Sequence, residues 1–308
     1  MTALRAALAD YLSLRRALGY KLQSVERLLG QFIDFLEAEH THTITTEGAL
    51  CWARQPPDAA LYWWSKRLSV VRGFASYLHA ADPTVEVPPP DLLPARSSRA
   101  TPYLYGESEI AALIEAAGRL GSPLKAATFQ TLIGLLAVTG MRVGEAIGLD
   151  QHDFDGEHRV LLIRNAKFGK TRELPLHPSS AAALGRYLTC PQRRRVATRT
   201  TALLISTVGT RLLYSNVHLT FQRLTRQAGL SPRTSRCRPR IHDLRHAFAV
   251  RTLLDAYRDE CDIDRRLTLL CTYLGHVNPA GTYWYLSAAP ELLTKAAERL
   301  QRAEQHHD

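Results

Sequence analysis

The chain has 308 residues, 45% of them hydrophobic, which is enough apolar content to build packed cores and excludes a disordered chain. Because single cores rarely grow past about 250–300 residues, two domains are the natural expectation at this length. Lys and Arg outnumber Asp and Glu by 39 to 29, a net charge of +10. This excess favours a polyanionic partner such as DNA, although a merely basic protein of another function stays open.

Cysteine usage and hydropathy predict a cytoplasmic protein without a membrane partner. No apolar run approaches the ~20 residues that span a bilayer. The basic start of the chain contains Asp10 and a regular helical stripe, so a folded helix is favoured over a transit peptide. The five cysteines are odd in number and widely spaced, which favours reduced thiols over a disulfide framework. They are Cys51, Cys190, Cys237, Cys261 and Cys271.

The first 81 residues predict a small helical domain. Apolar residues recur at helical spacing, and no segment carries a strand signal. Thr45 begins the short third helix, and Asp58 is expected to cap the fourth. The four predicted helices cover residues 4–18, 24–39, 45–52 and 58–78.

A proline-rich stretch, residues 82–102, follows this domain. Its six prolines fix φ and remove backbone donors, so an extended connector is predicted. Arg96 and Arg99 would suit a connector that crosses a phosphate backbone, or they only keep it soluble.

The remainder, residues 103–308, predicts a mostly helical domain with one small antiparallel sheet. The fold class is therefore mainly α (α+β). Two β-rich runs, 159–164 and 171–176, flank a Lys-Phe-Gly-Lys turn and predict a hairpin, and 203–206 can add a third strand. Gly140 ends the second helix, and Arg142 opens a short third one. The other predicted helices cover 107–117, 125–139, 214–228, 242–257, 265–274, a short segment at 282–286, and 290–302.

Six residues in this domain have the chemistry to hold and cleave a phosphodiester. They are Arg142, Lys167, His242, Arg245, His276 and Tyr285. Two guanidiniums can neutralise the charge that grows on phosphorus in the transition state, and a histidine can move protons near neutral pH. Tyr285 is the one group among the six suited to attack phosphorus and remain attached. Tyr283 has the plainer reading of a packing residue.

The order of these residues and their contexts resemble the tyrosine recombinase (integrase) family of DNA breaking-rejoining enzymes. The stretches that carry the resemblance are TGMRVGEAIGL, NAKFGKTRELPL, IHDLRHAFAV and LGHVNPAGTYWYL. It runs from about Tyr103 to the C-terminus, with a weaker echo in the first hundred residues. It implies a core-binding N-terminal domain and a catalytic C-terminal domain that close around duplex DNA.

The resemblance also assigns roles. Tyr285, nine positions after His276, becomes the nucleophile, and Arg142 and Arg245 clamp the phosphate. His242 transfers a proton and His276 donates a hydrogen bond to a non-bridging oxygen. Lys167 becomes the general acid, with Lys170 as its rival. Glu145 and Asp243 are expected to orient these groups without reacting.

Further basic residues are expected to bind DNA phosphates. These are Arg96, Arg99, Lys170, Arg172, Arg233, Arg236, Arg238 and Arg240. The alternative for Arg233, Arg236, Arg238 and Arg240 is a solvated loop without a role in DNA binding. No metal or other cofactor is expected. His242 and His246 with Cys237 suggest zinc, but Asp243 stands where the metalloprotease pattern has Glu, and no paired CxxC accompanies them.

The function expected from the resemblance is site-specific recombination of double-stranded DNA. Strands would be exchanged through a 3′-phosphotyrosine and a Holliday junction, in integration, excision or transposition of a mobile element. Four protomers would assemble on DNA through the C-terminal helix, and sister recombinases are further candidate partners. Packing of that helix on its own domain is the alternative. A type IB topoisomerase-like or telomere-resolving enzyme, or a catalytically silent accessory subunit, also stays open.

Overall fold

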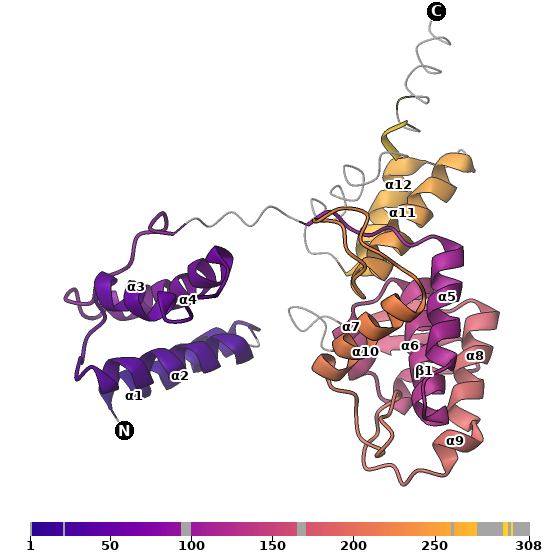
Figure 1. Ribbon diagram of the computed structural model, residues 1–308, viewed down its shortest axis with the longest axis horizontal. Helices are drawn as coiled ribbons and strands as arrows, with labels where there is room; N and C mark the ends of the chain where they lie inside the picture. Colours follow the sequence, from indigo (N-terminus) through magenta and orange to yellow (C-terminus); the bar gives the residue numbers. More distant parts are fainter. Residues whose placement is uncertain are drawn as a thin grey trace, which may run out of the picture. The chain divides into compact units, whose positions relative to one another are not determined.

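The computed structural model describes residues 2–20, 22–93, 100–164, 171–259, 262–275, 292–294 and 297. It divides the chain into two compact units, Met1–Arg99 and Ala100–Asp308 (Figure 1). Each unit has its own hydrophobic core, as expected for this chain length. The two units are described separately below.

The first unit is helical, as the apolar spacing predicts. Thr45 precedes the third helix, and its hydroxyl accepts a hydrogen bond from the Gly48 N–H at 3.1 Å, which satisfies one donor of the first turn. The expected cap at Asp58 is wrong, because the fourth helix begins at Leu61 after Ala60. The helices are α1 (Ala3–Ala17), α2 (Gln23–Ala38), α3 (Thr46–Arg54) and α4 (Leu61–His79).

Aromatic side chains fill the core of the first unit. Phe32 of α2 and Trp52 of α3 are buried, with ring centroids 5.1 Å apart. The buried guanidinium of Arg67 lies 3.7 Å from the Trp52 ring centroid and donates to the Trp52 carbonyl at 2.8 Å. This cation–π contact and hydrogen bond offset part of the cost of burying the charge.

The proline-rich stretch divides between the two units. Val85 and Leu93 are buried in the first core, and Arg72 of α4 donates to the carbonyl of Pro88 at 2.6 Å. Proline keeps its carbonyl acceptor, so this segment can be fastened without regular secondary structure. Residues 82–93 therefore belong to the first unit instead of a free connector, and residues 94–99 lie outside the described residues.

Helix α6 lies at the centre of the second unit and packs against α5, α8 and α11. It is apolar on most of its circumference, which is typical of a helix covered on several sides. Ser122 caps it, Pro123 occupies its first position, and Gly140 ends it. The helices of this unit are α5 (Glu107–Gly118), α6 (Pro123–Thr139), α7 (Val143–Gly148), α8 (Pro178–Thr189), α9 (Pro191–Arg194), α10 (Tyr214–Gln227), α11 (Asp243–Arg258) and α12 (Ile263–Leu274).

The small sheet of the second unit is antiparallel, with strand order β1-β2-β3. Its strands are β1 (Phe154–Asp155), which follows the 3₁₀ turn η1 (Gln151–Asp153), β2 (Val160–Ile163) and β3 (Arg172–Pro175). The predicted hairpin is confirmed, since Ile163 pairs with Arg172 and Leu161 with Leu174. The predicted third strand at 203–206 is wrong. Leu203, Leu204 and Ile205 are buried, but within this range the one described bridge joins Ile205 to Arg211. Core packing accounts for the apolar character of the run.

Two further features complete the second unit. Helices α8 and α9 occupy a stretch for which the pattern gave no prediction, although proline opens both helices. Helices α11 and α12 lie side by side and share a separate cluster in which Leu292 is buried (Figure 1). No helix in the described part of the chain is long and apolar enough to cross a membrane.

Candidate active site

Gly140 sets the direction of the chain into the first candidate residue, Arg142. Its φ of +59° lies in the left-handed region that side chains disfavour. A Cβ added there would lie 2.9 Å from Cγ of Phe248, so the glycine also allows α11 to approach. Two residues later, Arg142 is the N-cap of α7, as predicted.

Glu145 fixes both the main chain and the side chain of Arg142. One carboxylate oxygen accepts the Arg142 N–H at 2.8 Å, and the other accepts Nη1 of the guanidinium at 2.8 Å. The Glu145 side chain is 8% exposed. Burial alone would raise the pKa of this carboxyl, but hydrogen bonds from Arg172 and the Arg142 N–H outweigh it and lower the pKa to about 2. The Glu145 carboxyl therefore favours its anionic form beside Arg142.

Arg172, at the start of β3, contacts the same carboxylate. Its Nη2 and Nη1 donate to the two Glu145 oxygens at 2.9 and 3.2 Å, and its Nε donates to the Tyr273 carbonyl at 2.9 Å. The side chain is 13% exposed. All three guanidinium nitrogens of Arg172 thus donate to protein oxygens, and its expected role in binding DNA stays a prediction.

Arg245 of α11 is buried, with 2% of its surface exposed. Its Nη1 donates to the Gly140 carbonyl at 2.8 Å, and its Nη2 donates to the Leu274 carbonyl at 2.7 Å. A buried guanidinium needs such partners, since an unpaired charge would cost several kcal/mol. These bonds join the end of α6 to the end of α12.

The C-terminal end of α12 gathers three arginines. Successive carbonyls of Tyr273, Leu274 and Gly275 accept hydrogen bonds from Arg172, Arg245 and Arg142, the last at 3.5 Å. The last carbonyls of a helix lack partners in the helix and carry partial negative charge, so cations are favoured there. Arg142 and Arg245, 103 positions apart in sequence, thus donate to adjacent carbonyls.

His242, the N-cap of α11, lies in the electrostatic field of these arginines. Desolvation of the imidazolium and the positive charges of Arg245 and Arg142 lower its pKa to about 4. The neutral ring that results near pH 7 can accept a proton. His246, one turn later, is buried and meets the His242 ring edge-on, with centroids 5.1 Å apart.

Comparison with known proteins decides the family of the chain. The model of the phage integrase family matches residues 105–291, more than half of the sequence. A Sinorhizobium fredii strain NGR234 protein named as an integrase/recombinase, y4rB, is 45% identical over 98% of each chain. The chain belongs to the phage integrase family. It is therefore a tyrosine-type site-specific recombinase.

More distant relatives and solved structures have the same fold. The tyrosine recombinase XerC of Alcanivorax borkumensis is 29% identical over 71% of this chain and 67% of its own. The Tn1549 transposon integrase, solved with transposon right end DNA, aligns with a TM-score of 0.63 over 98% of this chain and 100% of that one, at 17% identity. XerH bound to a palindromic difH substrate aligns with a TM-score of 0.62 over 89% and 77%, at 20% identity.

In this recombinase, Asp243 fastens the entry segment of the second unit to the start of α11. It is fully buried and accepts the Tyr103 N–H at 3.2 Å and Nε of Arg240 at 3.0 Å. Burial raises the pKa of the carboxyl, against the opposing effect of Arg240. The Tyr105 hydroxyl donates to the Arg240 carbonyl at 3.1 Å. Asp243 thus connects the entry segment with Arg240, two positions before His242.

The structure places the expected DNA-binding arginines before His242 in two groups. Arg233 donates to the Leu104 carbonyl at 3.0 Å and lies 4.4 Å from the Tyr103 ring centroid, while Arg240 pairs with Asp243. Arg236 and Arg238 are exposed, and neither side chain bonds to another residue in the described ranges. The other expected site residues lie outside the described residues; they are Arg96, Arg99, Lys167, Lys170, His276 and Tyr285.

The sequence analysis did not predict the internal contacts of Arg172, although the strand pattern contains a signal. Side chains two apart in a strand share a face, so Arg172 lies on the face of Leu174, which is buried, and opposite Glu173, which is exposed. An arginine on the buried face needs a carboxylate or carbonyl partner nearby. The strand pattern could therefore have indicated that Arg172 bonds to groups within the protein, but not which groups these are.

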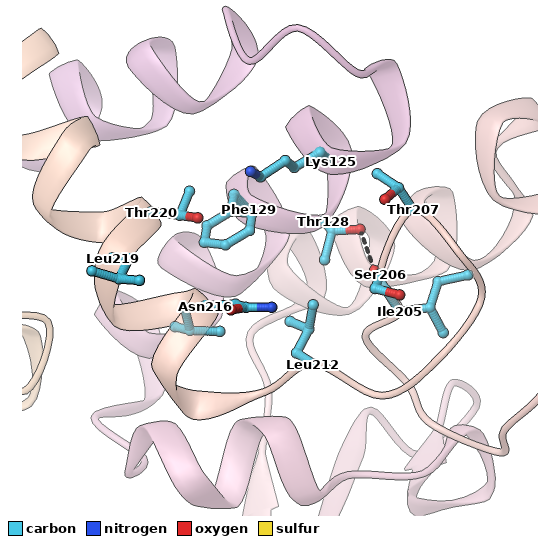
Figure 2. A pocket seen from close by; sticks show the side chains of 11 residues that line it. Lys125, Thr128, Phe129, Ile205, Ser206, Thr207, Leu212, Asn216, Leu219 and Thr220 are labelled. Atoms are coloured by element: carbon cyan, nitrogen blue, oxygen red, sulfur yellow. Dashed lines mark hydrogen bonds between the residues drawn. The ribbon is translucent and has the colours of Figure 1, made fainter.

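An acidic cluster and a pocket in the second unit are formed by other described residues. Asp150, His152 and Asp153 lie together, but Asp150 pairs with Arg211 and Asp153 with Arg164. A pocket of about 300 Å³ lies among α6, α10 and the 205–212 loop (Figure 2). In Figure 2, Thr128 donates to the Ile205 carbonyl, and Lys125 is the one charged side chain among the lining residues drawn.

Proposed function

We propose that this recombinase cleaves and rejoins double-stranded DNA through a covalent 3′-phosphotyrosine formed by Tyr285. The observation that supports this most strongly is the convergence of Arg142 and Arg245 on adjacent carbonyls at the end of α12, with His242 beside them. Two permanently charged forks at one position can bind the non-bridging oxygens of a single phosphate. Gly275 leads directly into His276 in the sequence, and Tyr285 follows nine residues later.

The proposed reaction proceeds in two steps, strand cleavage and strand rejoining. The Tyr285 hydroxyl attacks phosphorus and gives its proton to His242, while the bond from phosphorus to the 5′ oxygen breaks. Lys167 gives a proton to this leaving oxygen, which becomes a free 5′-hydroxyl. In the second step a 5′-hydroxyl from a partner duplex attacks phosphorus and gives its proton to Lys167, while the bond from phosphorus to the Tyr285 oxygen breaks and this oxygen regains its proton from His242. Arg142 and Arg245 stabilise the charge that grows on the phosphate in both steps, and His276 donates a hydrogen bond to it.

The proposed substrate is duplex DNA at a specific recombination site. The solved structures with this fold include a transposon integrase on transposon end DNA and XerH on a difH site. The net charge of +10 favours such a polyanion. We propose that the exposed Arg236 and Arg238 contact its phosphates, together with Arg96, Arg99 and Lys170, and that the protein serves integration, excision or transposition of a mobile element.

The covalent intermediate provides the test of the proposed function. A nicked duplex that loses a short 5′-hydroxyl fragment after cleavage traps the protein on DNA, and the adduct migrates slowly under denaturing conditions. Wild-type protein should form the adduct and Tyr285→Phe should not, while both bind the duplex equally, because only the nucleophilic oxygen is lost. An adduct with the Phe variant would identify another nucleophile. No adduct with wild-type protein on its own site would favour the silent accessory subunit.

The products distinguish recombination from the related reactions. Junctions between two duplexes support recombination, relaxation of plasmids without a specific site supports a topoisomerase-like enzyme, and hairpin ends support telomere resolution. Junctions that form only when a second recombinase is added would identify a sister subunit as a required partner.

Assembly through the C-terminal helix is a second part of the proposal. Leu292, within the predicted helix 290–302, is buried with Leu253 and Leu270 of the same chain. We propose that four protomers assemble on two sites and that this segment contacts a neighbour in the assembly. Deleting residues 290–308 should then preserve binding to one site and weaken cooperative complexes on paired sites. Unchanged cooperativity, with lower thermal stability alone, would indicate that the segment only completes its own domain.

A further inference from the structure

Arg172 joins three parts of the candidate site that are distant in the sequence. It begins β3, directly after the connection that contains Lys167, and its guanidinium reaches α7 through Glu145 and the end of α12 through Tyr273. The side chain is 13% exposed, and the two Glu145 oxygens accept from its two terminal nitrogens. This bidentate geometry needs the planar fork of arginine.

Glu145 transmits the position of Arg172 to Arg142. Its oxygen Oε1 accepts from Nη1 of both arginines, at 2.8 Å from Arg142 and 3.2 Å from Arg172. Its oxygen Oε2 accepts from the Arg142 N–H and from Nη2 of Arg172. Two cations thus share one buried anion, and a displacement of Arg172 would leave Glu145 free to turn toward Arg142 alone.

Arg172 also packs directly against the turn that ends α12. A Cβ added to Gly275 would lie 3.0 Å from Nη1 of Arg172, so the glycine allows the guanidinium to approach. The Gly275 φ of +67° ends the helix in the left-handed conformation, with its carbonyl 3.5 Å from Nη2 of Arg142. Arg172 therefore supports both the carboxylate and the carbonyl that contact Arg142.

We propose that Arg172 is a positioning residue for the strand-cleavage reaction: it holds Arg142 and the end of α12 in the geometry that binds the scissile phosphate, and it does not bind DNA itself. This inference rests on the proposed function. Its contacts support a role within the protein, because Nε, Nη1 and Nη2 each donate to a protein oxygen. A lysine at this position would keep the charge but could not make the bidentate contact together with the bond to Tyr273.

Salt dependence distinguishes positioning from phosphate binding. Each lost phosphate contact should reduce the slope of log K against log salt by about 0.9. Arg172→Lys and Arg172→Gln should keep the wild-type affinity and slope, yet lower the single-turnover rate of adduct formation by ~10²-fold, as for a catalytic group misplaced by about 1 Å. Arg238→Ala is the comparison variant for a phosphate contact and should reduce this slope, which the Arg172 variants should not do. A reduced slope for Arg172→Gln, with wild-type rate for Arg172→Lys, would overturn the proposal.

The cleavage rate on DNA with a neutral scissile phosphate distinguishes a positioning role of Arg172 from a purely structural one. Methylphosphonate DNA replaces one charged oxygen by a methyl group, so neutralisation by Arg142 becomes less important. If Arg172 acts through Arg142, the rate deficit of Arg172→Lys should shrink by ~10-fold or more on this substrate, as should that of Arg142→Ala. An equal deficit on both substrates would show that Arg172→Lys only damages the fold.

Coupling to Glu145 provides a second check. Arg172→Lys and Glu145→Gln should be non-additive, so that the double variant cleaves no more slowly than the slower single variant. Fully additive losses would overturn the proposed route through Glu145. Failure of the proposed function is separate, since wild-type protein would then form no adduct, or Tyr285→Phe would still form one. A wild-type adduct with an unimpaired Arg172→Lys variant would overturn the positioning role alone.

Discussion

Nη2 of Arg245 donates to the carbonyl oxygen of Leu274 at 2.7 Å, although the two residues are 29 positions apart. The contact joins α11 to the final turn of α12, one residue before Gly275. The same guanidinium donates to Gly140, so one buried cation connects the ends of two helices. A residue expected to hold a phosphate is thus also part of the structure that positions the other candidate residues.

Arg245→Lys should impair both stability and strand cleavage. The single ammonium nitrogen of lysine cannot reach the carbonyls of Gly140 and Leu274 together as the two terminal nitrogens of arginine do. An unsatisfied buried carbonyl costs about 1–3 kcal/mol. Adduct formation should fall by ~10²–10³ while duplex binding persists. Urea denaturation and single-turnover cleavage measure the two effects. Arg251→Lys on the same helix, at a half-exposed site, should change stability by less than about 0.5 kcal/mol. Wild-type cleavage by Arg245→Lys would contradict the clamp assignment.

Glu145→Gln should lower stability in a pH-dependent manner. The folded-state pKa of about 2 lies below the ordinary value of 4.5, so the carboxylate stabilises the fold fully above about pH 4.5 and loses this effect as pH falls toward 2. At pH 7 the variant should lose about 2–4 kcal/mol, because Arg142 and Arg172 lose their shared anion. The difference from wild type should narrow below pH 4.5 in urea titrations. Glu173→Gln, an exposed neighbour on β3, should show little effect at any pH.

Lys167→Ala should cleave ordinary DNA poorly but recover on DNA with sulfur in place of the bridging 5′ oxygen. Sulfur leaves without receiving a proton, so a general acid becomes dispensable. Rates of adduct formation on the two substrates provide the measurement. Equal impairment on both would make Lys167 a phosphate-binding residue, and selective rescue of Lys170→Ala would transfer the role to Lys170.

Gly140→Ala should destabilise the second unit, while Gly134→Ala on the same helix should stabilise it. Alanine at φ +59° is strained by roughly 1–2 kcal/mol, and its Cβ would press on the Phe248 ring. Gly134 lies inside α6 with no atom within 4 Å of an added Cβ, so alanine there should stabilise by roughly 0.5–1 kcal/mol. Thermal unfolding of both variants tests the pair. An unchanged melting temperature for Gly140→Ala would show that the turn can relax.

Local sequence was sufficient for most of the helices and for the hairpin. The apolar spacing of α2 and the capping residues Thr45 and Ser122 act within a few positions, so the chain specifies these elements by itself. The prediction from local sequence was wrong at residues 203–206, where an apolar run was interpreted as a strand. A short buried run has the same composition in a strand and in an irregular core segment, and only its neighbours decide between them.

The chemical identity of the candidate site was also determined by the sequence. The order of the candidate residues and their local motifs predicted the family before any contact was known, and the family match confirmed that prediction. The tertiary structure decided which charges are available to a ligand. Neither Arg236 nor Arg238 makes a side-chain bond within the described residues, whereas Arg172 and Arg233 are bonded to protein groups far away in the sequence and Arg240 to Asp243, three positions along. The sequence specifies that an arginine is charged. The partner of that arginine depends on which carboxylates and helix ends the fold brings within about 3 Å, because a hydrogen bond forms only at such short distances.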